Sequence, residues 1–202
     1  MSAAPRVTHP FEAMDVELFP YRRPFLALVQ NVLTPQECSA EIARMEAAGP
    51  SLATINAGGR VVQNMRVRNN DRVIFDDEGL AATLFARLAD AIPGEREGWR
   101  VCGLNERFRG YRYATGQRFA PHFDGSFVRT PDEQSLVTVI VYWNEGCGDG
   151  ETNFLDFELQ VTPKAGMALL FDHMVLHEGR EVTAGLKYAL RSDVMYRRAA
   201  PA

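Results

Sequence analysis

Two residues in the second half of the sequence have the types and spacing of transition-metal ligands. His122 and Asp124 stand one residue apart in the segment PHFDG. If this segment is a strand, side chains two positions apart project from the same side, so an imidazole and a carboxylate would lie together. They would supply two ligands of a 2-His-1-carboxylate site, the arrangement that holds non-haem iron(II). His-x-Asp alone is a weak signal, because a surface histidine beside a solvated aspartate is common.

A third ligand has to come from a distant part of the chain. His173 and His177 are the candidates in the segment FDHMVLHEG. Ten residues after His177 stands Lys187, within an apolar segment that has strand character. Burying a lysine there is costly unless its ammonium pairs with an anion. A dicarboxylate co-substrate would supply such an anion.

Two further motifs flank these residues in a definite order. Tyr113 opens the segment YATGQ shortly before His122, and a Gly-Asp-Gly-Glu-Thr turn ends at Thr152 after the apolar run LVTVIVYW. With the His-x-Asp pair, the distal histidine and the lysine, this pattern resembles the prolyl 4-hydroxylase-like family of Fe(II)/2-oxoglutarate-dependent dioxygenases. The resemblance covers residues 104–198.

The resemblance implies a role for each matching residue. The iron ligands would be His122, Asp124 and His177, since the spacing to the lysine favours His177 over His173. The 2-oxoglutarate site would be formed by the ammonium of Lys187 with the hydroxyls of Tyr113 and Thr152. Arg191 shares strand parity with Lys187 and is the alternative anion partner. Fe(II), 2-oxoglutarate and O2 would then be the cofactors, with ascorbate as a reductant.

The predicted function is hydroxylation of a C–H bond by this chemistry, with a prolyl or other side chain of a peptide or protein as the first candidate substrate. The family often has an aromatic hydroxyl at the position of Phe119 and an arginine at the position of Ser135. Because both positions bear on the substrate, a free amino acid or metabolite remains an alternative. A metal-binding barrel without catalysis is a third reading, but such a site needs no dicarboxylate pocket.

The polar stretch at residues 66–72 is predicted to carry substrate recognition. It holds several charges and amides, and loops over a rigid scaffold often bind ligands. We predict that three of its residues and one carboxylate across the opening contact the substrate: Arg68, Asn69, Asn70 and Glu106. The alternative is a connecting loop whose arginines pair with Asp76 and Asp77.

The elements that position these residues change character along the chain. After Gly98, short segments rich in β-branched and aromatic residues follow one another between turns, which is typical of a β-sandwich or barrel. The sequence therefore predicts a mainly β fold with packed helices (α+β), and the resemblance implies a double-stranded β-helix of the jelly-roll or cupin type. Residues 1–98 would be an N-terminal arm, strands and two supporting helices, and residues 99–200 the barrel core of the same domain.

The first half contains clear helix signals. After a predicted buried strand at residues 25–33, Thr34 is placed to cap a helix, with Pro35 at its first position and Glu37 completing a capping box. This helix should end at Gly49. A second helix is predicted for residues 78–92, with four apolar residues on one face: Leu80, Leu84, Leu88 and Ile92. A Gly-Gly turn between short strands is expected between the two helices.

Composition limits the remaining possibilities. The chain has 202 residues, a net charge of −4 and 46% hydrophobic residues, as in a globular domain with a sizeable core. The acidic balance argues against nucleic-acid or anionic-membrane partners. Cys38 and Cys102 are expected to be buried thiols. No signal peptide or long apolar run is visible, so we expect a cytoplasmic protein, with a peptide, protein or small molecule as its partner and an oligomeric state that the sequence does not predict.

Overall fold

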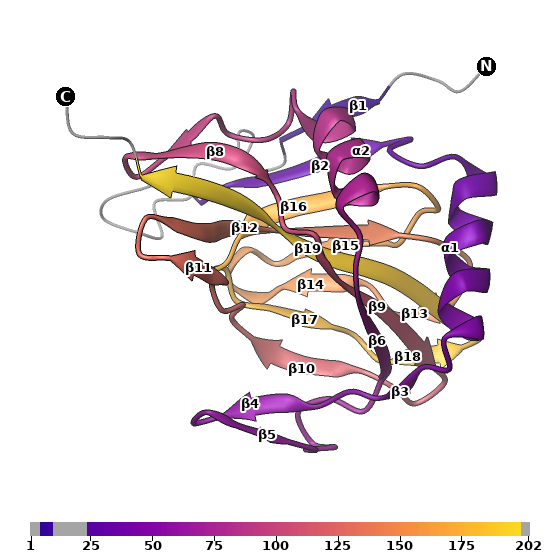
Figure 1. The fold of residues 1–202 in the computed structure, drawn as a ribbon. Coiled ribbons are helices and arrows are strands. Elements are labelled where there is room, and N and C mark those ends of the chain that lie inside the picture. Colours follow the sequence, from indigo (N-terminus) through magenta and orange to yellow (C-terminus); the bar gives the residue numbers. More distant parts are fainter. Residues whose placement is uncertain (1–4, 10–23, 199–202) are drawn as a thin grey trace.

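The computed structural model describes residues 5–9 and 24–198 as two facing β-sheets with two helices on the outside (Figure 1). The large sheet contains eleven strands among these residues. Its main path runs in the order β1 (Arg6–Thr8), β2 (Leu26–Gln30), β16 (Ala168–Asp172), β12 (Glu133–Tyr142), β19 (Leu186–Arg198), β9 (Arg107–Ala114), β6 (Asp71–Asp76) and β3 (Ser51–Leu52). Three strands lie off this path: β11 (Val128–Thr130), β8 (Trp99–Leu104) and β7 (Glu95–Arg96).

A smaller antiparallel sheet faces the large one and carries most of the predicted metal ligands. Its order is β10 (Phe119–His122), β17 (His177–Gly179), β14 (Thr152–Phe154) and β15 (Leu159–Val161), with a short 3-10 turn at Leu155–Phe157. Two small hairpins complete the described strands: β13 (Gly148–Asp149) with β18 (Val182–Ala184), and β4 (Ile55–Ala57) with β5 (Arg60–Val62). The arrangement is a double-stranded β-helix, so the predicted mainly β fold with packed helices is confirmed.

Alternation along β12 explains how this fold separates its core from its site. Val137, Val139 and Val141 are buried in the cluster that also contains residues of both helices. Successive strand residues face opposite sides, so Ile140 and Tyr142 point the other way and pack in a second cluster between the two sheets. The outer face of the large sheet therefore packs against the helices, and its inner face packs partly against the small sheet and partly lines a cavity.

The helices begin at the residues that the sequence indicates. Helix α1 (Pro35–Ala47) has the expected capping box, in which Thr34 Oγ1 accepts from the Glu37 amide and Glu37 Oε2 accepts from the Thr34 amide at 2.8 Å. Helix α2 (Glu78–Leu88) starts after Asp77, whose side chain accepts from the Leu80 amide. It ends at Leu88, before the predicted residue 92, and the chain continues as a turn in which the Ala91 and Ile92 amides both donate to the Leu88 carbonyl. Ile92 is nevertheless buried.

Several other expectations can be compared with the structure. The Gly-Gly turn lies between β4 and β5, where Gly58 and Gly59 both have positive φ. Cys38 is buried as predicted, but the expectation of a buried Cys102 is wrong, because its side chain faces outward from β8 and is exposed.

Strands β1, β2, β3 and β6 join the large sheet, so the part before residue 99 shares a sheet with the part after it. Much of the predicted N-terminal arm lies outside the described residues. Among the described helices, none has the length and apolar character needed to span a membrane.

The polar stretch at residues 66–72 is not the exposed loop that was expected. The Val67 carbonyl accepts from the Ala120 amide at 2.7 Å, the Asn69 amide donates to the Arg118 carbonyl at 3.3 Å, and Arg68 forms a bridge with Phe119. The segment therefore runs antiparallel along β10 and its backbone is paired. This pairing allows Arg68 and Asn70 to be buried, at 4% and 0% exposure.

Candidate active site

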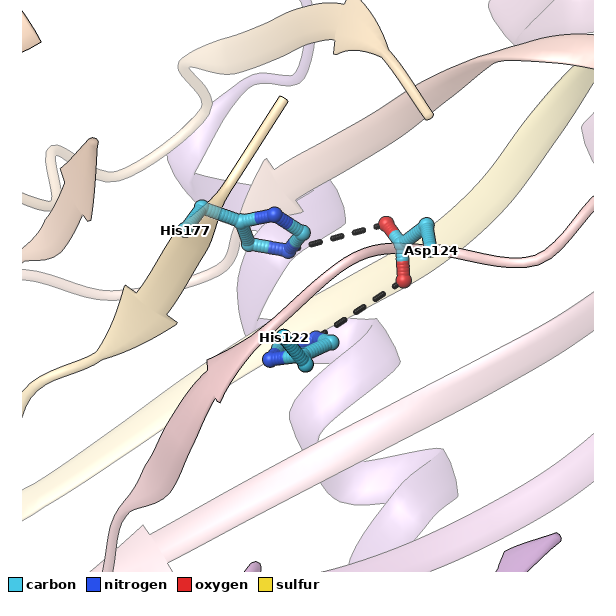
Figure 2. A group of neighbouring side chains, drawn as sticks. All are labelled: His122, Asp124 and His177. Atoms are coloured by element: carbon cyan, nitrogen blue, oxygen red, sulfur yellow. Dashed lines mark ion pairs between the residues drawn. The ribbon is translucent and has the colours of Figure 1, made fainter. Parts of the chain in front are cut away.

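Three side chains from two neighbouring strands of the small sheet and the segment after one of them lie close together. His122 ends β10, His177 begins β17, and the two are register partners in the small sheet. Asp124 lies just beyond β10, and its amide donates to the His173 carbonyl at 3.0 Å, which keeps the chain extended beside the sheet. Figure 2 shows both imidazoles directed at the two oxygens of this carboxylate. The distances are 3.7 Å from His122 Nε2 to Oδ1 and 3.6 Å from His177 Nε2 to Oδ2.

These distances fit a single metal ion. Two donor atoms bound to one first-row ion at about 2.1 Å each lie at most about 4.2 Å apart, and both His–Asp pairs meet this limit. All three ligand atoms lie within 4.8 Å of one another, close to the separation that one shared ion requires. Two imidazoles and one carboxylate form the donor set of a non-haem iron(II) site with open positions for substrates.

The hydrogen bonds of the two histidines leave the correct nitrogen free for a metal. His122 Nδ1 lies 2.8 Å from the Ala120 carbonyl, and His177 Nδ1 lies 2.9 Å from the Val175 carbonyl. A carbonyl can only accept, so each Nδ1 carries the proton and each Nε2 presents a lone pair. Both rings are thus fixed in the tautomer that binds a metal through Nε2.

Protonation states at neutral pH also suit metal binding. Burial, and then the neighbouring His177, lower the pKa of His122 to about 4, and burial lowers the pKa of His177 as well. Burial acts against the charged form of Asp124, but Arg191 and the two imidazoles hold its pKa well below the usual range. The site therefore offers two neutral imidazoles and one carboxylate, the forms that bind a metal without first losing a proton.

Behind Asp124 lies a chain of hydrogen bonds that the sequence did not reveal. Thr138 Oγ1 donates to Asp124 Oδ2 at 2.6 Å and lies 2.8 Å from His173 Nδ1. His173 Nε2 lies 2.8 Å from Ser135 Oγ, which accepts from the Phe127 amide. When His173 carries its proton on Nδ1, it donates to Thr138 Oγ1, and its Nε2 accepts from the Ser135 hydroxyl. Each hydrogen bond of the chain then has one donor and one acceptor. His173, the alternative ligand in the sequence interpretation, therefore supports the site from behind and lies outside the ligand cluster.

The residues predicted to hold 2-oxoglutarate line the same cavity as the ligands. Tyr113, Thr152 and Lys187 share this cavity with His122, Asp124 and His177. Tyr113 and Lys187 are register partners on β9 and β19, and the ammonium lies 5.1 Å from the Tyr113 ring centroid. Thr152 Oγ1 shares a 2.6 Å hydrogen bond with the Tyr142 hydroxyl, which fixes its direction.

Lys187 is a buried cation whose charge no carboxylate balances. It is 3% exposed, and its ammonium donates to the Gly150 carbonyl at 2.6 Å. Within the described part of the chain, no carboxylate forms an ion pair with it. Burial lowers its pKa to about 8. An anion bound in the cavity would compensate this charge.

Arg191, the alternative anion partner in the sequence interpretation, lies in the same cavity as Lys187. Its guanidinium lines the cavity beside the triad. Arg191 Nη2 lies 3.1 Å from Asp124 Oδ1 and 2.9 Å from Asp193 Oδ1. Only the register of β19 against β12 brings it to this position.

The four residues predicted to contact the substrate lie outside the lining of the cavity that holds the metal ligands. Arg68 donates to Asn70 Oδ1 and stacks on the rings of Phe119 and Tyr111 at 4.1 and 4.9 Å. Asn69 pairs with the backbone of Gly116 and Arg118, and the Asn70 amide donates to the Asp71 carbonyl. Glu106 forms an ion pair with Arg129. The arginine partners of Asp76 and Asp77 are Arg107 and Arg44, outside this stretch. None of the four lines the cavity, so their role at the substrate remains a prediction.

Comparisons with known proteins agree with this site. Residues 108–192, which include every ligand and co-substrate residue named above, match the sequence model of the 2OG-Fe(II) oxygenase superfamily. A comparison with curated proteins gave no significant match.

Solved structures share the fold. A viral collagen prolyl hydroxylase from Paramecium Bursaria Chlorella virus-1, in complex with 2OG, is 20% identical with a TM-score of 0.59 over 84% of this chain and 95% of its own. A Pseudomonas putida prolyl-4-hydroxylase is 19% identical with a TM-score of 0.58 over 87% and 93%. A Trichoplax adhaerens prolyl hydroxylase, in complex with a hypoxia inducible factor peptide fragment, is 18% identical with a TM-score of 0.62 over 86% and 83%. The barrel segment that contains the triad is therefore similar to the 2OG-Fe(II) oxygenase superfamily, and the chain shares its fold with prolyl hydroxylases of known structure.

Proposed function

We propose that this protein is an Fe(II)- and 2-oxoglutarate-dependent dioxygenase that hydroxylates a C–H bond, with a prolyl or other side chain of a peptide or protein as its substrate. One observation carries the proposal: a 2-His-1-carboxylate cluster lines the same cavity as a buried lysine that has no carboxylate partner among the described residues. A site that only bound a metal would have no use for the lysine, since burying its charge alone is unfavourable.

The residues of the chain divide the work between them. Lys187 and Thr152 would hold the distal carboxylate of 2-oxoglutarate, and Tyr113 would close the pocket from β9. Ile140 and Ala189 add an apolar lining that excludes water. Iron(II) at the triad, together with 2-oxoglutarate and O2, would supply the oxidising chemistry, because in cofactor enzymes the protein contributes ligation and orientation.

The choice of a peptide or protein substrate rests on the similar structures. Those named above are prolyl hydroxylases, and one of them is in complex with a peptide fragment. The alternative is a free amino acid or metabolite, because Phe119 and Ser135 replace residue types that the resembled family often has at these positions. Ser135 is buried in the hydrogen-bond chain behind Asp124, so it cannot contact a substrate directly.

The test combines binding and turnover. Anaerobic calorimetry should show that 2-oxoglutarate binds the wild-type protein only when Fe(II) or Mn(II) is present, and aerobic Fe(II) protein should form succinate. His177→Ala should abolish both, whereas His173→Ala should retain metal-dependent binding with lower affinity. Binding and turnover that persist in His177→Ala would contradict the ligand assignment. Substrates trapped on the Mn(II) and 2-oxoglutarate form can then be identified by mass spectrometry, with one added oxygen after turnover.

A further inference from the structure

A row of arginines crosses the inner face of the large sheet from the triad to β6, the strand next to the edge strand β3. Arg191 on β19 is the register partner of Arg109 on β9, and Tyr111 on β9 is the partner of Arg72 on β6. Directly opposed residues of antiparallel strands point to the same face, so these three arginines share the face that bears Lys187. Figure 1 shows the three strands side by side in this order.

The row has more positive than negative charge. Asp193 accepts from Arg109 at 3.3 Å and from Arg191 at 2.9 Å, and Asp124 is the second carboxylate on Arg191. Arg72 donates to the Thr54 carbonyl and hydroxyl, and forms no ion pair with a carboxylate of the described chain. Arg68, stacked beside the row, is bonded to an amide oxygen only. Four arginines thus face two carboxylates, one of which is a proposed metal ligand.

Neighbouring groups respond to this excess of charge. Burial raises the pKa of Tyr111, yet Arg68, Arg191 and Arg109 outweigh burial and leave the pKa below its ordinary value. Burial, followed by repulsion from other arginines, lowers the pKa of Arg72. In addition, Arg191 Nε is buried without an acceptor among the described residues. A buried donor without a partner is unfavourable, so the local chemistry favours an additional acceptor with negative charge.

The row is separate from the site proposed for 2-oxoglutarate. Lys187 lies four residues before Arg191 on β19, so both project into the cavity at different depths along one strand. Arg191 alone of the row lines the cavity, whereas Arg72 lies on β6, where the neighbouring Ile74 on the same face is 41% exposed. The row therefore leads from the proposed metal centre across β9 to β6, where Arg72 lies beside the edge strand β3 and the half-buried row approaches solvent.

We propose that this row, Arg72, Arg109 and Arg191, binds a carboxylate of the substrate and so selects acidic substrates. The inference rests on the proposed function and narrows its substrate class. Guanidinium groups bind carboxylates through paired, charge-assisted hydrogen bonds. The carboxylate belongs either to an acidic side chain of a peptide or to a free amino acid. We prefer a carboxylate to a phosphate as the bound anion, because peptides and amino acids carry a carboxylate without any modification.

Matched acid and amide probes test the proposal without turnover. The protein is loaded with Mn(II) and 2-oxoglutarate under argon, and dissociation constants are measured by calorimetry at low salt. One arm compares end-blocked proline peptides flanked by Asp or Glu with their Asn or Gln counterparts. The other arm compares L-proline, L-aspartate and L-glutamate with their amides. A peptide containing phosphoserine is included as a competitor for the carboxylate.

The expected result is a preference for acid over amide of about tenfold or more in one arm, since a charge-assisted bond is worth about 1.5–3 kcal/mol. A preference in the peptide arm would assign the carboxylate to an acidic side chain of a peptide, and a preference in the other arm would assign it to a free amino acid. Arg72→Gln should remove most of this preference, and Arg109→Gln serves as a second variant if the first does not fold. Arg100→Gln, which removes an exposed arginine of β8, should keep it.

Four outcomes would overturn the proposal. Equal binding of acids and amides, or no binding of any probe, excludes selection of a carboxylate. A preference that persists in both Arg72→Gln and Arg109→Gln places the carboxylate elsewhere. Tighter binding of the phosphoserine peptide assigns the row to a phosphate. Failure of the proposed function would look different, because 2-oxoglutarate would then not bind the Mn(II) wild-type protein before any probe is added.

Discussion

Thr138 Oγ1 lies 2.6 Å from Asp124 Oδ2, so a hydroxyl on the central strand β12 holds a proposed metal ligand in place. The same hydroxyl lies 2.8 Å from His173 Nδ1 and can accept from it. Both Thr138 and His173 are buried, at 0% and 3% exposure. A threonine that accepts from one side must donate to the other, so the direction of the Asp124 carboxylate is coupled to a histidine that itself binds no metal.

The first prediction concerns this contact. Thr138→Val keeps the shape of the side chain but leaves Asp124 Oδ2 and His173 Nδ1 without their shared partner. Loss of a residue that orients a metal ligand typically costs about ten- to a hundredfold in metal affinity. We expect this loss in a Mn(II) titration, with near-complete recovery in Thr138→Ser. Thr183→Val, which removes an exposed hydroxyl bonded to Asp149, is the control and should bind metal normally. Unchanged affinity in Thr138→Val would show that the hydroxyl has no positioning role.

The second prediction concerns the charge of Lys187. Lys187→Met should weaken 2-oxoglutarate binding about ten- to a hundredfold, the value of one charge-assisted bond, with little effect on Mn(II) affinity. The exposed Lys164→Met is the matched control. If Arg191→Met gave the larger loss and Lys187→Met none, Arg191 would be the anion partner.

The same lysine predicts a dependence on pH. Burial lowers the pKa of Lys187 to about 8, and only the charged form attracts an anion. A bound carboxylate stabilises the ammonium, so binding should take up protons near this pH. Above about pH 8 the dissociation constant for 2-oxoglutarate should rise by up to about tenfold per pH unit. Calorimetry in two buffers of different ionisation enthalpy measures the proton uptake, and Lys187→Met should show neither effect.

The third prediction concerns acid stability at the start of α1. The hydrogen bond from Arg87, followed by the Thr34 amide, lowers the pKa of Glu37 to about 2 from an ordinary value of 4.5. A carboxyl whose pKa is lower in the folded state stabilises the fold above pH 4.5 and loses this effect as the pH falls toward 2. Glu37→Gln should therefore be less stable than wild type in urea at pH 7, and the difference should shrink by pH 3. A difference that stays constant over this range would exclude the carboxylate as its cause.

Parts of the fold and site that depend on local patterns could be predicted from the sequence. Thr34 and Glu37 define the start of α1 because a capping box is contained within four residues. His122 and Asp124 are close in sequence, and their common direction follows from the extended chain. The structure brings His177 and Lys187 to the same cavity, although the choice between His173 and His177 required the family resemblance.

Parts that depend on strand register could not be predicted in this way. Thr138 meets Asp124 because His173 bonds through its backbone to both Asp124 and Leu136, and Arg191 meets Arg109 because β19 and β9 pair with a particular offset. The polar stretch at residues 66–72 looked exposed because nothing within it satisfies its backbone. Its partner, β10, lies about fifty residues further along the chain, a distance over which local pattern carries no information.

The last prediction follows from the corrected position of Arg68. Its guanidinium lies 4.1 Å from the Phe119 ring centroid, and the opposite neighbour of Phe119 is His122, with ring centroids 3.6 Å apart and an interplanar angle of 16°. Phe119 therefore lies in contact with both a cation and a metal-binding imidazole. If Arg68 only contacted the substrate, its replacement would lower hydroxylation of the substrate and leave the uncoupled decarboxylation of 2-oxoglutarate unchanged.

The stack predicts a different pattern for Arg68→Leu. Loss of the cation frees the Phe119 ring and, through it, the His122 ring, so Mn(II) affinity and both rates should fall together by at least several-fold. Arg68→Lys, which keeps the charge without the planar group, should show a smaller loss, because the guanidinium stacks on an aromatic face as an ammonium cannot. Arg66→Leu, an exposed neighbour, should match wild type. If Arg68→Leu lost hydroxylation alone, with metal affinity and uncoupled turnover intact, Arg68 would act at the substrate and the stack would not position His122.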